Sequence, residues 1–155
     1  MLIDTHAHVN FAAFKEDAEP TIKRALADGV QVVLVGTQID TSKEAVELAE
    51  KFNSGVYAVA GLHPVHTYSQ ELDEEESHFR TREENFNTLE YQRICQSTKV
   101  VGIGECGLDY FRLPQDDGLL VKQEDRHQAI KQKQNHYFRE YLSCVIPDSD
   151  PGSRK

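Results

Sequence analysis

The chain has 155 residues, of which 39% are hydrophobic and 28% charged, and its formal net charge is −9. No apolar run approaches the roughly 20 residues of a membrane-spanning helix, and no secretory signal opens the chain, so we expect a cytoplasmic protein with no membrane partner. The acidic balance argues against affinity for nucleic acid through Lys and Arg, but it does not exclude a nuclease in which a metal ion meets the phosphate.

Apolar runs of strand length alternate with helical patterns in the first two thirds of the chain. The predicted strands are Leu2–Ile3, Val30–Val35, Val56–Gly61 and Lys99–Gly104. The predicted helices run from about Ala18 to Leu26, Thr41 to Phe52 and Glu83 to Gln96. Thr41-x-x-Glu44 indicates a capping box at the start of the second helix. Short strands that alternate with helices imply crossover connections and a parallel α/β sheet.

The remaining segments are less regular. The acidic stretch from Gln70 to Asn87 is typical of a solvated surface rather than of a carboxylate metal site. A last helix is predicted from Gln123 to Leu142. Its predicted inward-facing residues are Ile130, Tyr137, Phe138, Tyr141 and Leu142. Cys144-Val145-Ile146 could begin a fifth strand, but a polar, turn-rich stretch follows at once, so we expect one domain over residues 1–143 and a disordered tail over 144–155.

Chemically capable residues stand where the predicted strands end. His6 and His8 are two residues apart, so an extended strand would turn both imidazoles to one face, where they suit a divalent metal. The alternative is a pair of exposed histidines. Glu105 follows the fourth strand, and parallel strands gather their carboxyl ends at one rim. We therefore expect His6, His8 and Glu105 to share a metal site, in which a carboxylate can bridge to a second metal.

Three further residues are candidates for substrate contact. His63 and His66 flank Pro64 after the third strand, and either could contact a phosphate or transfer a proton. The alternative for both is an ordinary surface histidine on a rigid loop. Arg112 lies on the loop after Glu105, where a guanidinium suits bidentate phosphate binding, although a lone loop arginine is commonly just solvated.

Three blocks of the sequence resemble the signatures of the TatD family of metal-dependent deoxyribonucleases, in the right order and at suitable separations. The blocks are Asp4-Thr-His-Ala-His8, Gly61-Leu-His-Pro64 and Gly102-Ile-Gly-Glu-Cys-Gly-Leu-Asp-Tyr110. The resemblance implies a TIM-type (β/α)₈ barrel, of which this chain holds about the first half. It also implies hydrolysis of DNA phosphodiester bonds, commonly as a 3′→5′ exonuclease on single strands, with up to two divalent ions (Mg²⁺, or else Mn²⁺ or Zn²⁺).

The same resemblance implies individual roles. His6 and His8 would bind the first metal, Glu105 would bridge both metals as the catalytic carboxylate, and His63, His66 and Arg112 would lie near the scissile phosphate. The family's later ligands, two histidines and an aspartate, have no counterpart here. The alternative function is therefore a non-catalytic fragment that self-associates or joins another chain through open sheet edges. A related amidohydrolase acting on C–N or C–O bonds is a third reading, because such enzymes share the H-x-H pair.

Overall fold

The chain folds into two compact units, Met1–His63 with Leu89–Glu105, and Pro64–Thr88 with Cys106–Lys155. The computed structural model describes residues 2–69, 71–74, 77–111, 113 and 123–145. None of the helices in these ranges is long and apolar enough to cross a membrane.

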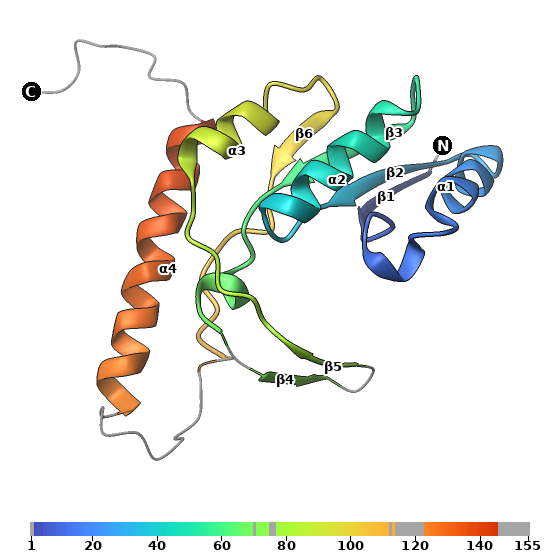
Figure 1. The fold of residues 1–155 in the computed structure, drawn as a ribbon. Helices are drawn as coiled ribbons and strands as arrows, with labels where there is room; N and C mark the ends of the chain where they lie inside the picture. The colour runs from blue at the N-terminus through green and yellow to red at the C-terminus, as the bar shows by residue number, and fades with distance from the viewer. Residues whose placement is uncertain (1, 70, 75–76, 112, 114–122, 146–155) are drawn as a thin grey trace, which may run out of the picture. The chain divides into compact units, whose positions relative to one another are not determined.

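The first unit is built on a four-stranded parallel sheet (Figure 1). Its strands are β1 (Leu2–Ala7), β2 (Val30–Val35), β3 (Val56–Ala60) and β6 (Val100–Ile103). They lie side by side in the order β1-β2-β3-β6, so each strand pairs with the next strand of this sheet along the chain. This confirms the predicted parallel α/β arrangement. β1 extends beyond the apolar run Leu2–Ile3 and ends at Ala7, so the strand includes His6.

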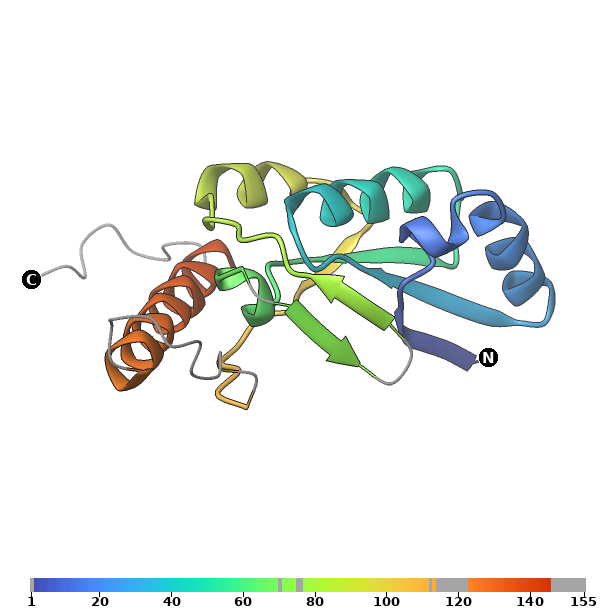
Figure 2. The ribbon, with the colours of Figure 1, turned by 60° about the horizontal axis from the view of Figure 1, so that its bottom comes forward.

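Three helices cover one face of this sheet, α1 (Ala18–Ala27), α2 (Ile39–Glu50) and α3 (Thr88–Ile94), as Figure 2 shows. A 3₁₀ turn, η1 (Ala12–Phe14), precedes α1. A cluster of buried apolar side chains lies between the helices and the sheet. Its buried members are Ile22, Val32, Leu34, Ala45, Val46, Leu48, Ala49, Phe52, Val56 and Ala58. The three helices lie on the same side of the sheet, which is expected where right-handed crossovers join neighbouring parallel strands in chain order.

The predicted start of α2 is wrong by about one turn. Gln38 is the N-cap, and Thr41 is the third residue of the helix. The Oγ1 atom of Thr41 accepts hydrogen bonds from the backbone N–H groups of Thr37 (2.9 Å) and Gln38 (3.0 Å). A hydroxyl inside the first turn therefore satisfies donors that precede the helix, in place of the predicted box between Thr41 and Glu44.

The second unit contains η2 (Pro64–Thr67), an antiparallel hairpin of β4 (Glu71–Glu74) and β5 (Ser77–Arg80), and α4 (Gln123–Val145). The hairpin falls in the acidic stretch from Gln70 to Asn87, for which we predicted only a solvated segment. Its register sets Glu71 opposite Arg80 and Glu74 opposite Ser77.

The segment before α3 packs along α4 rather than forming the predicted helix from Glu83. Tyr137 donates a 2.9 Å hydrogen bond to Asn85 Oδ1, Thr88 donates a 2.8 Å bond to Glu140, and the rings of Phe86 and Tyr141 are 4.2 Å apart. These contacts hold the backbone of residues 83–87 extended beside the helix, so α3 begins only at Thr88.

The prediction of which α4 side chains face inward is confirmed for three of five residues. Ile130, Tyr137 and Tyr141 are buried as expected, whereas Phe138 and Leu142 are exposed. The helix also continues through Val145, so Cys144 and Val145 extend it instead of opening a fifth strand. The predicted tail from residue 146 onward lies outside the described residues.

Candidate metal centre

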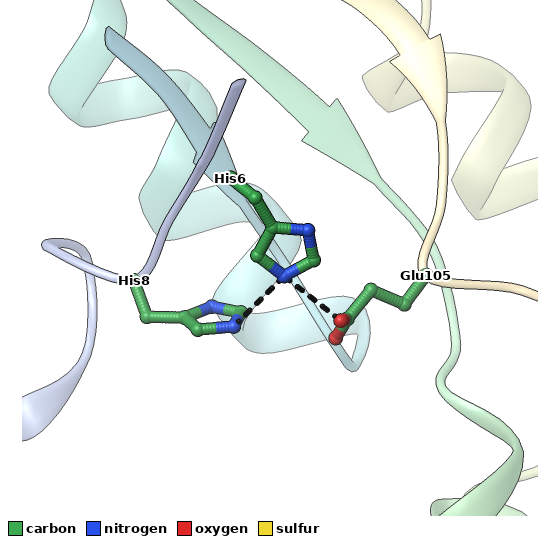
Figure 3. Close-up of side chains that lie close together, drawn as sticks. All are labelled: His6, His8 and Glu105. Atoms are coloured by element: carbon green, nitrogen blue, oxygen red, sulfur yellow. Dashed lines mark hydrogen bonds and ion pairs between the residues drawn. The ribbon is translucent and has the colours of Figure 1, made fainter. Parts of the chain in front are cut away.

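Two histidines at the end of β1 and a glutamate after β6 converge within the first unit (Figure 3). The Nε2 atoms of His6 and His8 are 3.2 Å apart, and His6 Nε2 is 2.9 Å from Glu105 Oε1. One ligand atom from each of the three residues lies within 4.8 Å of the other two. Residues separated by almost a hundred positions along the chain thus meet because β1 and β6 are parallel and end at the same side of the sheet.

The ring of His8 is oriented by the neighbouring strand. Its Nδ1 lies 3.1 Å from the carbonyl oxygen of Val35, the last residue of β2. A carbonyl oxygen only accepts hydrogen bonds, so Nδ1 must carry the proton, and in the neutral ring Nε2 presents its lone pair to His6 and Glu105. The ring of Phe11 stacks on His8 with centroids 4.4 Å apart, which fixes the imidazole plane.

Asn10 shares the same carbonyl. This buried side chain donates from Nδ2 to the oxygens of Val35 (3.3 Å) and Thr41 (3.0 Å), so Val35 accepts two hydrogen bonds and α2 is tied to the end of β1. The sequence offered no direct signal for this role beyond the position of Asn10 two residues after His8. A carboxamide or carbonyl that orients a ligating imidazole is a common feature of metal sites.

Glu105 is positioned by a close approach of two glycines. The N–H of Gly104 donates to the carbonyl of Ala60 (3.0 Å). A Cβ atom on Gly61 would overlap the carbonyl group of Gly104, so only glycine allows this contact. The fully buried hydroxyl of Ser42 accepts from the N–H of Gly61 (3.1 Å) and donates to its carbonyl (3.3 Å), which anchors the end of β3 to α2. The backbone that carries Glu105 is therefore held from both sides.

The donor set fits a divalent cation. Two imidazole nitrogens and a carboxylate oxygen face one another, and a proton or a metal ion between them relieves the repulsion of their lone pairs. The 3.2 Å between the two nitrogens matches two neighbouring ligands on one ion with metal–nitrogen bonds of about 2.1 Å. The side chain of His6 is 52% exposed and that of Glu105 is 25% exposed, so water and a substrate can reach the group.

The other predicted site residues are not members of this cluster. His63 is half-buried in the first unit and donates from its backbone N–H to the carbonyl of Thr37 (2.8 Å). His66 is half-buried in the second unit, where its carbonyl accepts from the N–H of Glu84 (2.8 Å). Arg112 lies outside the described residues. Burial raises the pKa of the thiol of Cys106, which follows Glu105 in the chain.

Comparison with known proteins identifies relatives over most of the chain. A sequence model of the family described as TatD related DNase matches residues 3–144. The uncharacterized metal-dependent hydrolase YabD of Bacillus subtilis strain 168 is 36% identical over 111 residues, which cover 71% of this chain and 38% of YabD. The 3′-5′ ssDNA/RNA exonuclease TatD of Pantoea sp. strain At-9b is 33% identical over 112 residues, 72% of this chain and 38% of the exonuclease.

The fold is found in a solved structure as well. The crystal structure of YjjV, a TatD homologue from Escherichia coli K12, matches with a TM-score of 0.62 and 26% identity over 93% of this chain and 46% of YjjV. The chain thus spans less than half the length of these relatives, and its α/β repeat is about the first half of a TIM-type barrel. The family match, the metal-dependent relatives and the shared fold agree, and the chain belongs to the TatD-related DNase family.

Proposed function

We propose that His6, His8 and Glu105 bind a divalent metal ion and that the chain hydrolyses phosphodiester bonds in single-stranded DNA as a 3′→5′ exonuclease. Mg²⁺ is the first choice of ion, with Mn²⁺ and Zn²⁺ as alternatives. The observation that supports this is the convergence of two imidazole nitrogens and one carboxylate oxygen within 4.8 Å at the carboxyl ends of β1 and β6. The domain we assign to this function is the half-barrel of residues 1–143.

The residues have distinct proposed roles. His6 and His8 would hold the ion through Nε2, and the contact of His8 Nδ1 with the Val35 carbonyl leaves the lone pair on Nε2. Glu105 contributes a negative oxygen ligand and can accept the proton of an attacking water molecule. The ion supplies Lewis-acid stabilisation of the charge that develops on the phosphate oxygens. His63, His66 and Arg112 are proposed substrate contacts, and the predicted cytoplasmic location stays a prediction.

Metal titration and a cleavage assay test this proposal together. We expect Mn²⁺ to bind the wild-type chain more weakly than a full barrel would bind it, because three ligands replace about six. An end-labelled single-stranded oligonucleotide should be shortened from its 3′ end only when metal is added. His8→Ala should abolish both signals, whereas His136→Ala, an exposed histidine on α4, should change neither. Metal-dependent cleavage that survives His8→Ala would exclude this centre.

A second candidate function is a non-catalytic protein that self-associates through its sheet edges. Leu2 (69% exposed) and Ile3 (48% exposed) lie on β1, one edge of the four-stranded sheet, and Val101 (57% exposed) lies on β6, the other edge. Exposed apolar residues on the edge strands of a sheet favour pairing with a further strand. In this second proposal, association through the sheet edges replaces catalysis.

A further inference from the structure

The loop that follows Glu105 exposes large apolar side chains in the second unit. We name Leu108–Phe111 the aromatic loop. Leu108 is 45% exposed, Tyr110 is 44% exposed and Phe111 is 93% exposed. Burying a phenylalanine ring that is almost wholly in water would stabilise it by about 1.5–3 kcal/mol. Exposed apolar side chains grouped on one loop are therefore typical of a binding site.

The aromatic loop is held in place by polar contacts from α4. Gln134 is 1% exposed, and its Oε1 accepts from the N–H of Asp109 (3.0 Å). Its Nε2 donates to the carbonyls of Asp109 (3.2 Å) and Pro64 (3.3 Å). The N–H of Phe111 donates to Asp109 Oδ1 (3.0 Å), which forms a local turn. The exposed rings are therefore presented by a fixed backbone, which lowers the entropy cost of binding to them.

The same helix supplies a cation and a polar anchor beside Tyr110. Lys131 Nζ lies 5.0 Å from the centroid of the Tyr110 ring, and Asn135 Nδ2 donates to the Tyr110 hydroxyl (3.0 Å). Lys131, Gln134 and Asn135 are three and four residues apart, so they share one face of α4. Exposed aromatic rings next to a lysine are the combination with which proteins hold single-stranded nucleic acid, because bases stack on rings and phosphates meet the cation.

We propose that the aromatic loop and Lys131 form a stacking platform for unpaired nucleobases of single-stranded nucleic acid. The choice of ligand rests on the proposed function. Leu108–Phe111 and Lys131 all belong to the second unit. Duplex DNA hides its base faces inside the stack and is not a ligand of this platform.

A binding assay without metal tests the platform independently of catalysis. Fluorescence anisotropy would follow a labelled oligothymidylate of about 10 nucleotides in EDTA, which prevents cleavage and metal bridging. Phe111→Ala should weaken binding by about fivefold to 150-fold, the cost of losing stacking on one base. Phe111→Trp should retain or strengthen it. Phe138→Ala is the matched control, because it removes another exposed phenylalanine of the same unit.

Two further readouts separate stacking from charge. An oligonucleotide of abasic sites has no base faces, so Phe111→Ala should not change its weak binding. The logarithm of affinity for the thymidylate should fall with the logarithm of salt concentration, and the contact of Lys131 with one phosphate should contribute about 0.7 to that slope. Lys131→Gln should reduce that slope and leave the effect of Phe111→Ala in place.

The outcomes discriminate between the two proposals. Equal affinity of Phe111→Ala and wild type for the thymidylate overturns the platform, and so does a loss that is equally large for duplex DNA. Loss of self-association in Phe111→Ala, seen by sedimentation without nucleic acid, would make the loop a protein interface instead. If stacking fails while metal-dependent cleavage persists, the proposed function stands without the platform. If stacking holds while Mn²⁺ does not bind, the platform stands and the catalytic proposal fails.

Discussion

The imidazole of His8 illustrates what sequence alone can and cannot predict about a single residue. Two-residue spacing on a strand predicts that His6 and His8 point to one face, and their Nε2 atoms are indeed 3.2 Å apart. The spacing does not predict which ring nitrogen faces the site, because that depends on the Val35 carbonyl, 27 residues further along the chain. The convergence was predictable from local pattern, and the tautomer was not.

Replacing Glu105 by glutamine should weaken metal binding while leaving the fold intact. The amide keeps the shape of the carboxylate but removes the negative charge that faces His6 at 2.9 Å. Changes in residues that merely orient ligands cost about 10–100-fold in metal affinity, so loss of a ligand charge should cost no less. Isothermal titration with Mn²⁺ measures this, with circular dichroism to confirm folding. Unchanged affinity in Glu105→Gln would remove Glu105 from the centre.

Gly61 should tolerate no side chain, because the end of β3 touches the backbone that carries Glu105. In Gly61→Ala the new Cβ would overlap the Gly104 carbonyl, and the strands must separate. We expect a loss of about 1–3 kcal/mol in the free energy of unfolding and a parallel loss of metal affinity. Gly102→Ala is the control, since its Cβ would meet only Val59 Cγ2 at an ordinary 3.5 Å. Urea denaturation of both variants checks the difference.

At the scale of elements, the apolar runs predicted all four parallel strands, because buried strands between crossover helices are continuously apolar. The hairpin β4–β5 was not predictable in this way. The first strand, Glu71–Glu74, has the acidic composition of a solvated segment, and neither strand contains a β-branched residue, so the two form only by pairing with each other. The late start of α3 likewise depends on contacts with α4. These contacts join residues more than fifty positions apart, so local sequence patterns do not predict them.

The start of α2 gives a test at this scale. Thr41→Ala removes the oxygen that accepts from the N–H groups of Thr37 and Gln38, and loss of such a helix-start interaction costs about 1 kcal/mol. Thr41→Ser should restore most of this stability, because serine keeps the hydroxyl. Glu44→Ala should have little effect, which distinguishes the observed arrangement from a capping box between Thr41 and Glu44. The measurement is the midpoint of urea unfolding, and a larger loss in Glu44→Ala than in Thr41→Ala would contradict it.

At the scale of the whole molecule, the parallel sheet has two edges, β1 and β6, and a further strand can pair with either of them. A (β/α)₈ barrel has no edges because its eight strands close on themselves, whereas the sheet formed by the described residues has β1 at one edge and β6 at the other. All strands point the same way, so a strand from another chain can extend either edge in the parallel sense. The alternation of strands and helices in the sequence predicts this parallel sheet. It does not predict how exposed Leu2 and Val101 are, which the structure shows.

Charged substitutions at the two edges should therefore reduce self-association. Leu2→Lys and Val101→Lys place a charge on β1 and β6, and an edge lysine opposes pairing with a further strand because the added strand would cover it. Sedimentation velocity over a range of protein concentrations should show the wild-type chain forming larger species that the double variant lacks. Leu89→Lys is the matched control, because Leu89 is as exposed as Leu2 (66% against 69%) but lies on α3. If the control lowers association as much as the edge variant, general surface apolarity drives it, and the sheet edges are not the interface.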